Sequence, residues 1–379
     1  MDLGCLRELF EVPDDITYLD SAAYSLLPRS VRMAGEEGIA SKSRPWEMAR
    51  GLNTEWTERG RAAASKLIGA GRDDVAIVSS VSHGLATVVA NIVLPTGSRV
   101  LRLQDEHSSI VLALDRLAET QGVVVEVVQR PADGDWTAVL LEAIDRPGAA
   151  RLSLAALTPL HWSDGALVDL DVLAPKVRRA GALLVIDATQ AVGVMDMDVG
   201  RLLPDFLMFP TYKWLLGPYS LAFLYVAPRH QSGRGLDDNL GNLPGGRPAV
   251  GARRFDKGEV GDPIGLRMAA VGMELVSTWG NLAVEDTLGR LTNRIAEGVS
   301  GIGLQVLAKR FRAPHIIGVR LPGGAPPDLV ARLAEADVHV SDRLGVIRIS
   351  PHVWASDADC DRVVAALSTA GAGEALSSG

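Results

Sequence analysis

Length, charge and cysteine content argue against several classes of protein. The 379 residues carry a formal net charge of −8 and no lysine- or arginine-rich run, so neither nucleic acid nor a membrane is an expected partner. No apolar stretch approaches the roughly 18 residues of a transmembrane helix, residues 1–10 do not resemble a signal peptide, and two cysteines are too few for a disulfide framework, so we expect a cytoplasmic protein.

The first 262 residues predict a short N-terminal segment and one large domain. The segment covers 1–27, the domain covers 28–262, and helical spacing over 29–68 is interrupted at Pro45. Strands are then predicted at 75–78, 100–103, 123–128, 152–157, 183–186, 206–209 and 221–226, and helices at 82–93, 108–120 and 170–179. This alternation predicts right-handed βαβ units, and therefore an α/β fold with a mostly parallel sheet between two layers of helices.

The remaining residues predict a small C-terminal domain. Residues 229–262 are rich in Gly, Asp, Arg and Asn, and a loop of this length is expected to be a lid or an interface arm. The small α/β domain with its linking helices spans 263–370, and 371–379 is expected to be a disordered tail. Helices and strands are predicted at 266–279, 283–299, 316–321, 327–335, 338–341, 346–350 and 358–367.

A lysine and an aspartate stand at the ends of neighbouring apolar runs. Lys213 lies between the runs 206–209 and 221–226, and a lysine held out of water there would lose its proton easily and become an amine nucleophile. Asp187 ends the apolar run 183–186, where ligands bind in open α/β sheets. Pyridoxal 5′-phosphate (PLP) requires such a pair, a carboxylate for its ring nitrogen and an amine for its aldehyde. A surface lysine remains the alternative for Lys213 taken alone.

With these motifs the chain resembles the class V aminotransferase group of fold type I PLP enzymes, which includes cysteine desulfurases, kynureninase and isopenicillin N epimerase. The resemblance runs from about Tyr18 to Leu367. It implies PLP as cofactor, a large domain with a seven-stranded type of sheet, a small C-terminal α/β domain, and a homodimer with shared active sites in which 229–262 serves as an arm. No metal site is expected.

The resemblance implies three catalytic residues. Lys213 would form the Schiff base with PLP and later move the Cα proton, and Asp187 would hold the proton of the ring nitrogen. His107, in the segment 105–109, matches the histidine that stacks on the ring. A helix cap or a surface position is the alternative for His107.

Four further residues are implied to contact the cofactor. Ser82 and His83 begin a predicted helix, whose N-terminus suits a phosphate, although Ser82 could be a helix N-cap only. Gln190 matches a residue against the cofactor hydroxyl or phosphate, and Tyr212 matches a donor to the phosphate.

Three residues are implied to contact the substrate. Arg348 matches the arginine that clamps the α-carboxylate, for which the guanidinium fork is suited. Trp162 stands where relatives have Asn, so it would form a wall of the substrate pocket or pack in the core. Tyr24 lies in the segment along the mouth of the site.

The resemblance does not fix the reaction, because PLP supports several. A desulfurase needs a nucleophilic cysteine, but Cys360 lies among acids and Cys5 precedes the ordered core. We therefore favour β-elimination of the C–S lyase type on an amino acid or its conjugate. A class V aminotransferase is the first alternative, for which Arg44 and Arg253 are candidates for a second carboxylate clamp. An epimerase follows, and a non-enzymatic binding protein comes last.

Overall fold

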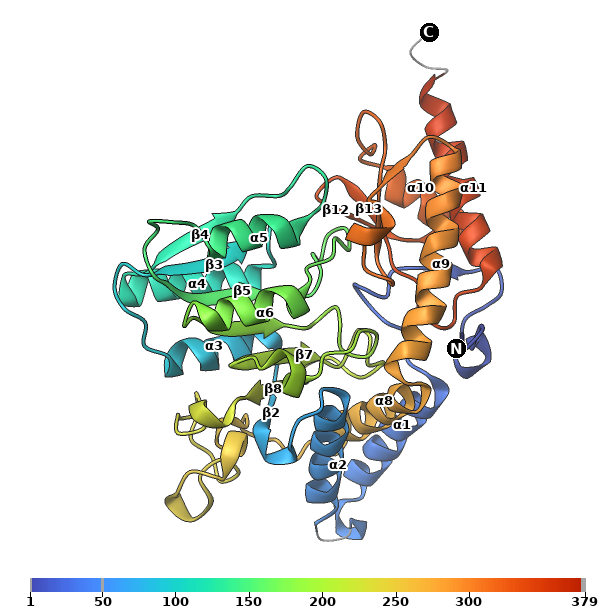
Figure 1. Cartoon of the computed structure of the whole chain (residues 1–379). Coiled ribbons are helices and arrows are strands. Elements are labelled where there is room, and N and C mark those ends of the chain that lie inside the picture. Colours follow the sequence, from blue (N-terminus) through green and yellow to red (C-terminus); the bar gives the residue numbers. More distant parts are fainter. Residues whose placement is uncertain (1, 49–50, 376–379) are drawn as a thin grey trace.

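A seven-stranded, mostly parallel sheet forms the centre of the large domain in the computed structural model, which describes residues 2–48 and 51–375 (Figure 1). Its order is β2-β8-β7-β6-β5-β3-β4, and β8 runs antiparallel to both of its neighbours. The strands are β2 (Val75–Val78), β3 (Arg99–Leu103), β4 (Val124–Val128), β5 (Leu152–Leu157), β6 (Leu183–Asp187), β7 (Phe206–Pro210) and β8 (Ala222–Val226). Every residue of β5, β7 and β8 is buried, because these apolar runs are covered on both faces. The predicted α/β fold is confirmed.

Helices cover both faces of the sheet and create two apolar cores. The helices that precede the small domain are α1 (Arg29–Ser43), α2 (Leu52–Leu67), α3 (Val81–Asn91), α4 (Ser108–Gln121), α5 (Trp136–Ile144), α6 (Leu170–Arg179), α7 (Val199–Leu202) and α8 (Gly265–Trp279). Residues of α3 and α4 belong to one core, and residues of α5 and α6 belong to the other. The long helices α1 and α2 both pack against α8 below the sheet (Figure 1).

The arm, residues 229–262, contains only short 3-10 helices, and one of them, Gly251–Phe255, lies against the edge strand β2 (Figure 1, yellow). The buried carboxylate of Asp256 accepts a hydrogen bond from the backbone N–H of Ile77 at 2.7 Å. It also pairs with the buried guanidinium of Arg61 on α2 at 2.7 Å. Both charged groups are buried and pair with each other instead of with water, so this ion pair holds the arm against the rest of the large domain.

The small domain is a four-stranded antiparallel sheet with helices on one side. Its elements are α9 (Asn281–Gly301), β9 (Gln305–Val306), β10 (Ile317–Arg320), α10 (Leu329–Glu335), β11 (Val338–His339), β12 (Ser341–Arg343), β13 (Val346–Ile349) and α11 (Asp357–Ala375), and the sheet order is β12-β13-β10-β9. The N-terminal segment joins this domain, because β1 (Thr17–Tyr18) pairs in parallel with β11.

Some boundaries differ from the sequence prediction. The helix α11 continues to Ala375, so the first part of the predicted disordered tail, 371–379, is helical, and 376–379 lies outside the described residues. The predicted interruption of the helical region 29–68 at Pro45 is confirmed, since α1 ends before Pro45 and α2 begins after it. No helix within 2–48 or 51–375 combines the length and the apolar character needed to cross a membrane.

Candidate active site

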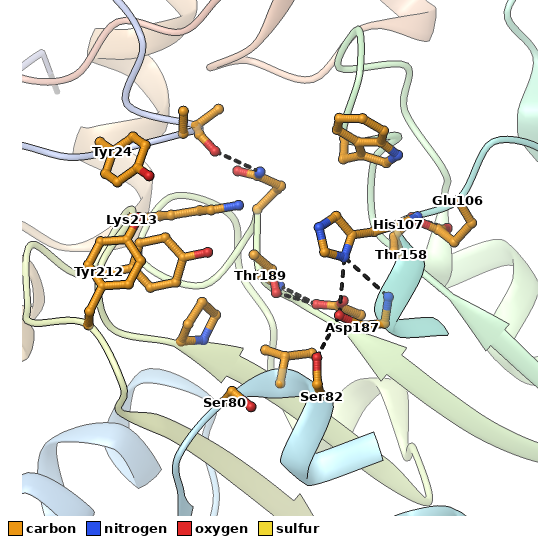
Figure 2. Close-up of a pocket in the computed structure, with 18 of the residues that line it drawn as sticks. Tyr24, Ser80, Ser82, Glu106, His107, Thr158, Asp187, Thr189, Tyr212 and Lys213 are labelled. Atoms are coloured by element: carbon orange, nitrogen blue, oxygen red, sulfur yellow. Dashed lines mark hydrogen bonds between the residues drawn. The ribbon is translucent and has the colours of Figure 1, made fainter. Parts of the chain in front are cut away.

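A cavity of about 460 Å³ opens at the carboxyl ends of the parallel strands, which is a size typical of small-molecule sites (Figure 2). The large-domain strands, the N-terminal segment and the small-domain hairpin β12–β13 all contribute to its wall. Nine of the ten predicted site residues line it: Tyr24, Ser82, His107, Trp162, Asp187, Gln190, Tyr212, Lys213 and Arg348. In Figure 2, Lys213 enters beside Tyr212, His107 lies across the cavity, and Ser80 and Ser82 lie at one end.

Lys213 is the buried amine that the sequence predicted. Its side chain is 9% exposed, and burial lowers the pKa of the amine to about 7, with a further decrease caused by the charge of Arg348 and an opposing effect of Asp187. The turn that carries it is tight, because a Cβ at Gly217 would meet the Cβ of Thr211 at 2.8 Å. A lysine with such a pKa is a competent nucleophile near neutral pH.

Asp187 ends β6 with a fixed orientation. Its carboxylate accepts hydrogen bonds from the backbone N–H of Thr189, at 2.9 Å, and from the hydroxyl of the same residue. Both bonds go to one oxygen, Oδ1. The orientation of this buried carboxylate is therefore set before any ligand binds.

His107 is the N-cap of α4 and remains open to the cavity. Its Nδ1 faces the backbone N–H and the hydroxyl of Ser109, and its ring lies edge-on to Trp162 with centroids 5.9 Å apart. Partial burial lowers the pKa of His107, so the ring is neutral near pH 7. Stacking of this ring on the cofactor stays a prediction.

The helix α3 begins at Val81, one residue earlier than predicted. Ser80 is its N-cap and accepts a hydrogen bond from the backbone N–H of His83 at 3.0 Å. Ser82 instead contacts the hydroxyl of Ser109 at 2.9 Å. The imidazole of His83 turns to Ser79, 3.0 Å away, and does not line the cavity. The prediction that the side chain of His83 contacts the cofactor is therefore not supported.

Gln190 connects the N-terminal segment to the site. Its Nε2 donates to the carbonyl of Ala22 at 3.1 Å, and its Oε1 accepts from the indole of Trp214 at 2.8 Å. The carbonyl of Gln190 faces Nε2 of the buried His315 at 2.5 Å. Its main contacts are therefore within the protein, which leaves one Nε2 hydrogen for a ligand.

Arg348 is a buried guanidinium with part of its fork engaged. It pairs with Asp20 at 3.2 Å and donates to the carbonyl of Trp162 at 3.0 Å. Its Nε is buried and has no partner among residues 2–48 and 51–375. Burial lowers the pKa of Arg348 to about 10, but the side chain remains charged at neutral pH. It keeps N–H groups for an anion, as the predicted carboxylate clamp requires.

Sequence reasoning missed two charged residues of this cavity, Glu106 and Arg343. Burial, and secondarily the charge of Asp187, raises the pKa of Glu106 to about 7. Glu106 accepts from the backbone N–H of His107 at 2.8 Å. An acid in the short segment that follows the apolar strand β3 was a usable signal for it, as the acid that ends β6 was for Asp187. Arg343 carried no such signal, because its place depends on the pairing of β12 with β13.

Three other predictions concern residues outside the cavity. Burial, and secondarily Asp357 and Asp359, raises the pKa of the Cys360 thiol to about 12, and neither this cysteine nor Cys5 lines the cavity. This agrees with the exclusion of a desulfurase nucleophile. Neither candidate for a second carboxylate clamp lines this cavity: Arg44 pairs with Glu47, and Arg253 pairs with Glu58 and Asp73.

Comparison with known proteins identifies the family. The sequence model named Aminotransferase class-V matches residues 17–238, which is more than half of the chain. The chain belongs to this family. It is 25% identical to a probable cysteine desulfurase of Pyrococcus abyssi over 93% of both chains, and 29% identical to a kynureninase of Burkholderia mallei over 60% of this chain and 56% of the relative.

Solved structures show the same fold. The cysteine desulfurase of Thermococcus onnurineus NA1 superimposes with a TM-score of 0.84 at 21% identity, covering 97% of this chain and 98% of the other. The cystine C–S lyase C-DES has a TM-score of 0.84 at 19% identity, covering 94% and 98%. The protein is thus a PLP-dependent enzyme of fold type I.

The cavity residues fit this cofactor. A buried amine of lowered pKa and an oriented carboxylate are the two groups that the aldehyde and the ring nitrogen require. The first turn of α3 offers N–H groups without partners inside the helix, which suits a phosphate. Aromatic side chains complete the wall, including Tyr212 stacked on Tyr219 with centroids 4.0 Å apart.

Proposed function

We propose that the protein catalyses the β-elimination of an amino acid by cleavage of a C–S bond, as in a cysteine conjugate. The observation that carries this proposal is a readily deprotonated amine, Lys213, in a cavity that neither cysteine lines. A base that removes the Cα proton is sufficient for elimination, whereas transfer of sulfur to the enzyme needs a thiol nucleophile at the site.

Each residue of the cavity has a separate role in the proposed reaction. Lys213, Asp187, His107 and the N-terminus of α3 would hold PLP, which when bound supplies an electron sink for bonds broken at Cα. Arg348 binds the substrate α-carboxylate, and the amine of Lys213 takes the Cα proton. The electron pair of the Cβ–S bond leaves on sulfur, which takes a proton and departs as a thiol. The three-carbon remainder takes up water and leaves as pyruvate and ammonia.

The names of the relatives support this choice. The cystine C–S lyase C-DES is by name an enzyme that cleaves a C–S bond, and its structure contains cysteine persulfide as the reaction product. Cysteine desulfurases stand among both the sequence relatives and the structural neighbours. No cysteine lines the cavity among the described residues, and this supports a lyase over a desulfurase.

A product assay with S-substituted cysteines tests the proposal. We expect the purified protein to show the absorbance of lysine-bound PLP, and to release pyruvate and ammonia without any added keto acid. Lys213→Ala should remove both the absorbance and the products. Conversion of the cofactor to its pyridoxamine form, reversed by a keto acid, would refute elimination and establish an aminotransferase.

Transamination is the second candidate because the cavity contains a second arginine. Arg343 lines the cavity together with Arg348, as a site for a dicarboxylic amino acid or keto acid would require. Epimerisation is the third, and exchange of the Cα proton with retention of the whole substrate would reveal it. The same absorbance and product assay separates all three reactions.

We also propose a homodimer. The arm exposes large apolar side chains, such as Leu240 at 90% and Val250 at 72% exposed, and α1 exposes Met33 and Ile39. Large apolar side chains that are exposed on an arm of the chain are suited to an interface. The resemblance to enzymes that build each active site from two chains supports the same arrangement.

A further inference from the structure

Arg343 is a charged cavity residue that the proposed reaction does not use. It lines the cavity and is only partly exposed. Within residues 2–48 and 51–375 its side chain makes one hydrogen bond, from Nη1 to the neighbouring carbonyl of Asp342, at 2.8 Å. No carboxylate pairs with Arg343 within residues 2–48 and 51–375, whereas Arg348 beside it has Asp20. An arginine placed in a cavity without an acid is suited to bind an anionic ligand.

The register of the β12–β13 hairpin places both arginine side chains on the same face, where both line the cavity. Arg343 lies opposite Val346, and Ser341 lies opposite Arg348. Two residues directly opposite each other point to the same face of a sheet, and so do two residues that are two positions apart in one strand. Arg348 lies opposite Ser341, and Arg343 is two positions after Ser341, so the side chains of Arg343 and Arg348 lie on the same face of the hairpin. As diagonal neighbours they begin about 7–8 Å apart. Asp342 points to the other face, where its carboxylate caps Gly345 at 3.1 Å.

The charges around Lys213 leave one cation uncompensated. Both guanidinium groups line the same cavity as Lys213, and the charge of each lowers the pKa of its amine. Arg343 also acts on Arg348 as a like charge. Asp20 compensates Arg348, and Asp187 is the carboxylate expected at the cofactor ring. When the substrate α-carboxylate has bound to Arg348, Arg343 still faces the cavity with a charge that no carboxylate of the described residues pairs, and with Nη1 alone engaged, at the carbonyl of Asp342.

We propose that Arg343 binds a second carboxylate, on the side chain of the substrate, and so selects amino acids that carry an anionic side chain such as S-carboxyalkyl cysteines. This inference rests on the proposed amino-acid site and on Arg348 as its α-carboxylate clamp. The closeness of the two arginines requires a short linkage between the two carboxylates. A planar fork makes two parallel hydrogen bonds to a carboxylate, which a neutral amide cannot match.

Binding of two nearly isosteric ligands to the PLP-loaded enzyme tests the proposal. S-carboxymethyl-L-cysteine carries a carboxylate where S-carbamoylmethyl-L-cysteine carries a neutral amide. The binding of each ligand is measured by the change in cofactor absorbance. We expect the wild type to prefer the carboxylate by about tenfold or more, because charged hydrogen bonds are about twice as strong as neutral ones. Arg343→Gln should abolish the preference, and Arg343→Lys should retain part of it.

A matched control removes the same charge elsewhere in the small domain. Arg332 on α10 pairs with Asp328 at the surface and does not line the cavity, so Arg332→Gln should keep the full preference. Equal affinities of the wild type for the two ligands, or a preference that survives in Arg343→Gln, would overturn the role proposed for Arg343. Neither result would contradict the proposed amino-acid site. Absence of any absorbance change with either ligand would overturn the proposed amino-acid site together with this inference.

Discussion

At the scale of single residues, the chemistry of the site depends on how its neighbours set the charge of Lys213. Burial contributes most to its lowered pKa, and Arg348 and then Arg343 add to it, whereas Asp187 and Asp20 oppose it. The amine is thus close to the balance point between its two forms at neutral pH, where a general base works best. The arginines that bind carboxylates therefore also help to activate the lysine.

The rate of cofactor uptake by the apoprotein should show this effect. Because only the neutral amine attacks the aldehyde, we expect the rate to rise with pH through about 7, instead of near 10 as for an unperturbed lysine. Arg348→Gln removes a neighbouring positive charge and should move the midpoint of this rise in rate to higher pH. Stopped-flow absorbance from pH 6 to 10 measures the uptake rate and therefore the midpoint. A midpoint unchanged in Arg348→Gln but shifted in the surface variant Arg332→Gln would contradict this explanation.

Glu106 should make the stability of the apoprotein depend on pH. Its pKa is raised to about 7 in the folded state, so the neutral form is favoured there. Its contribution is fully present below its ordinary pKa near 4.5 and is lost as pH rises through about 7. The variant Glu106→Gln can still accept a hydrogen bond from the N–H of His107 but does not titrate. Its unfolding free energy should therefore fall less between pH 5 and pH 8 than that of the wild type, with a difference of at most about 3 kcal/mol. Urea unfolding at the two pH values measures it, and an unchanged pH dependence would refute it.

At the scale of helices and strands, the sequence predicted those parts of the site that follow apolar runs. Lys213 and Asp187 were found because each stands at the end of a run long enough to be a buried strand. His83 was misplaced because α3 begins at Val81, and each residue of shift turns a helical side chain by about 100°. Arg343 could not be found, because its direction depends on strand pairing in a separate domain.

The turn between β12 and β13 offers a test at this scale. Leu344 and Gly345 have φ values of 57° and 75°, as a two-residue turn with two left-handed positions requires. Leucine is strained in this conformation, whereas asparagine adopts it readily. We expect Leu344→Asn to raise the unfolding free energy by roughly 0.5–1 kcal/mol and Leu344→Val to lower it. Urea midpoints of the three proteins measure the effect, and the reverse order would disprove the assignment of strain to this turn.

At the scale of the whole molecule, the cavity exists only where three parts of the chain meet. Arg348 of the small domain pairs with Asp20 of the N-terminal segment and bonds to the carbonyl of Trp162 in the large domain. Gln190 makes a second link by holding Ala22. Because β1 also pairs with β11, movement of the small domain would carry the N-terminal segment with it. Opening of the cavity would then separate both from the sheet as one unit.

The exposed apolar residues of the arm should hold two copies of the chain together. Light scattering should give a mass of about 80 kDa, twice the 40.2 kDa of one chain. Leu240→Asp places a charge on a side chain that is 90% exposed, so it should weaken the dimer without unfolding the monomer. Leu282→Asp, at the start of α9 in the small domain, is the matched control and should leave the dimer intact.

Activity measured across a dilution series completes this test. If residues of the arm reach the site of the partner, the Leu240→Asp variant should lose cofactor and turnover as it dissociates, and should recover both at high protein concentration, because association follows mass action. The control variant should keep its specific activity over the same range. A wild-type monomer of 40.2 kDa that holds PLP and turns over substrate would overturn the dimer and its shared sites.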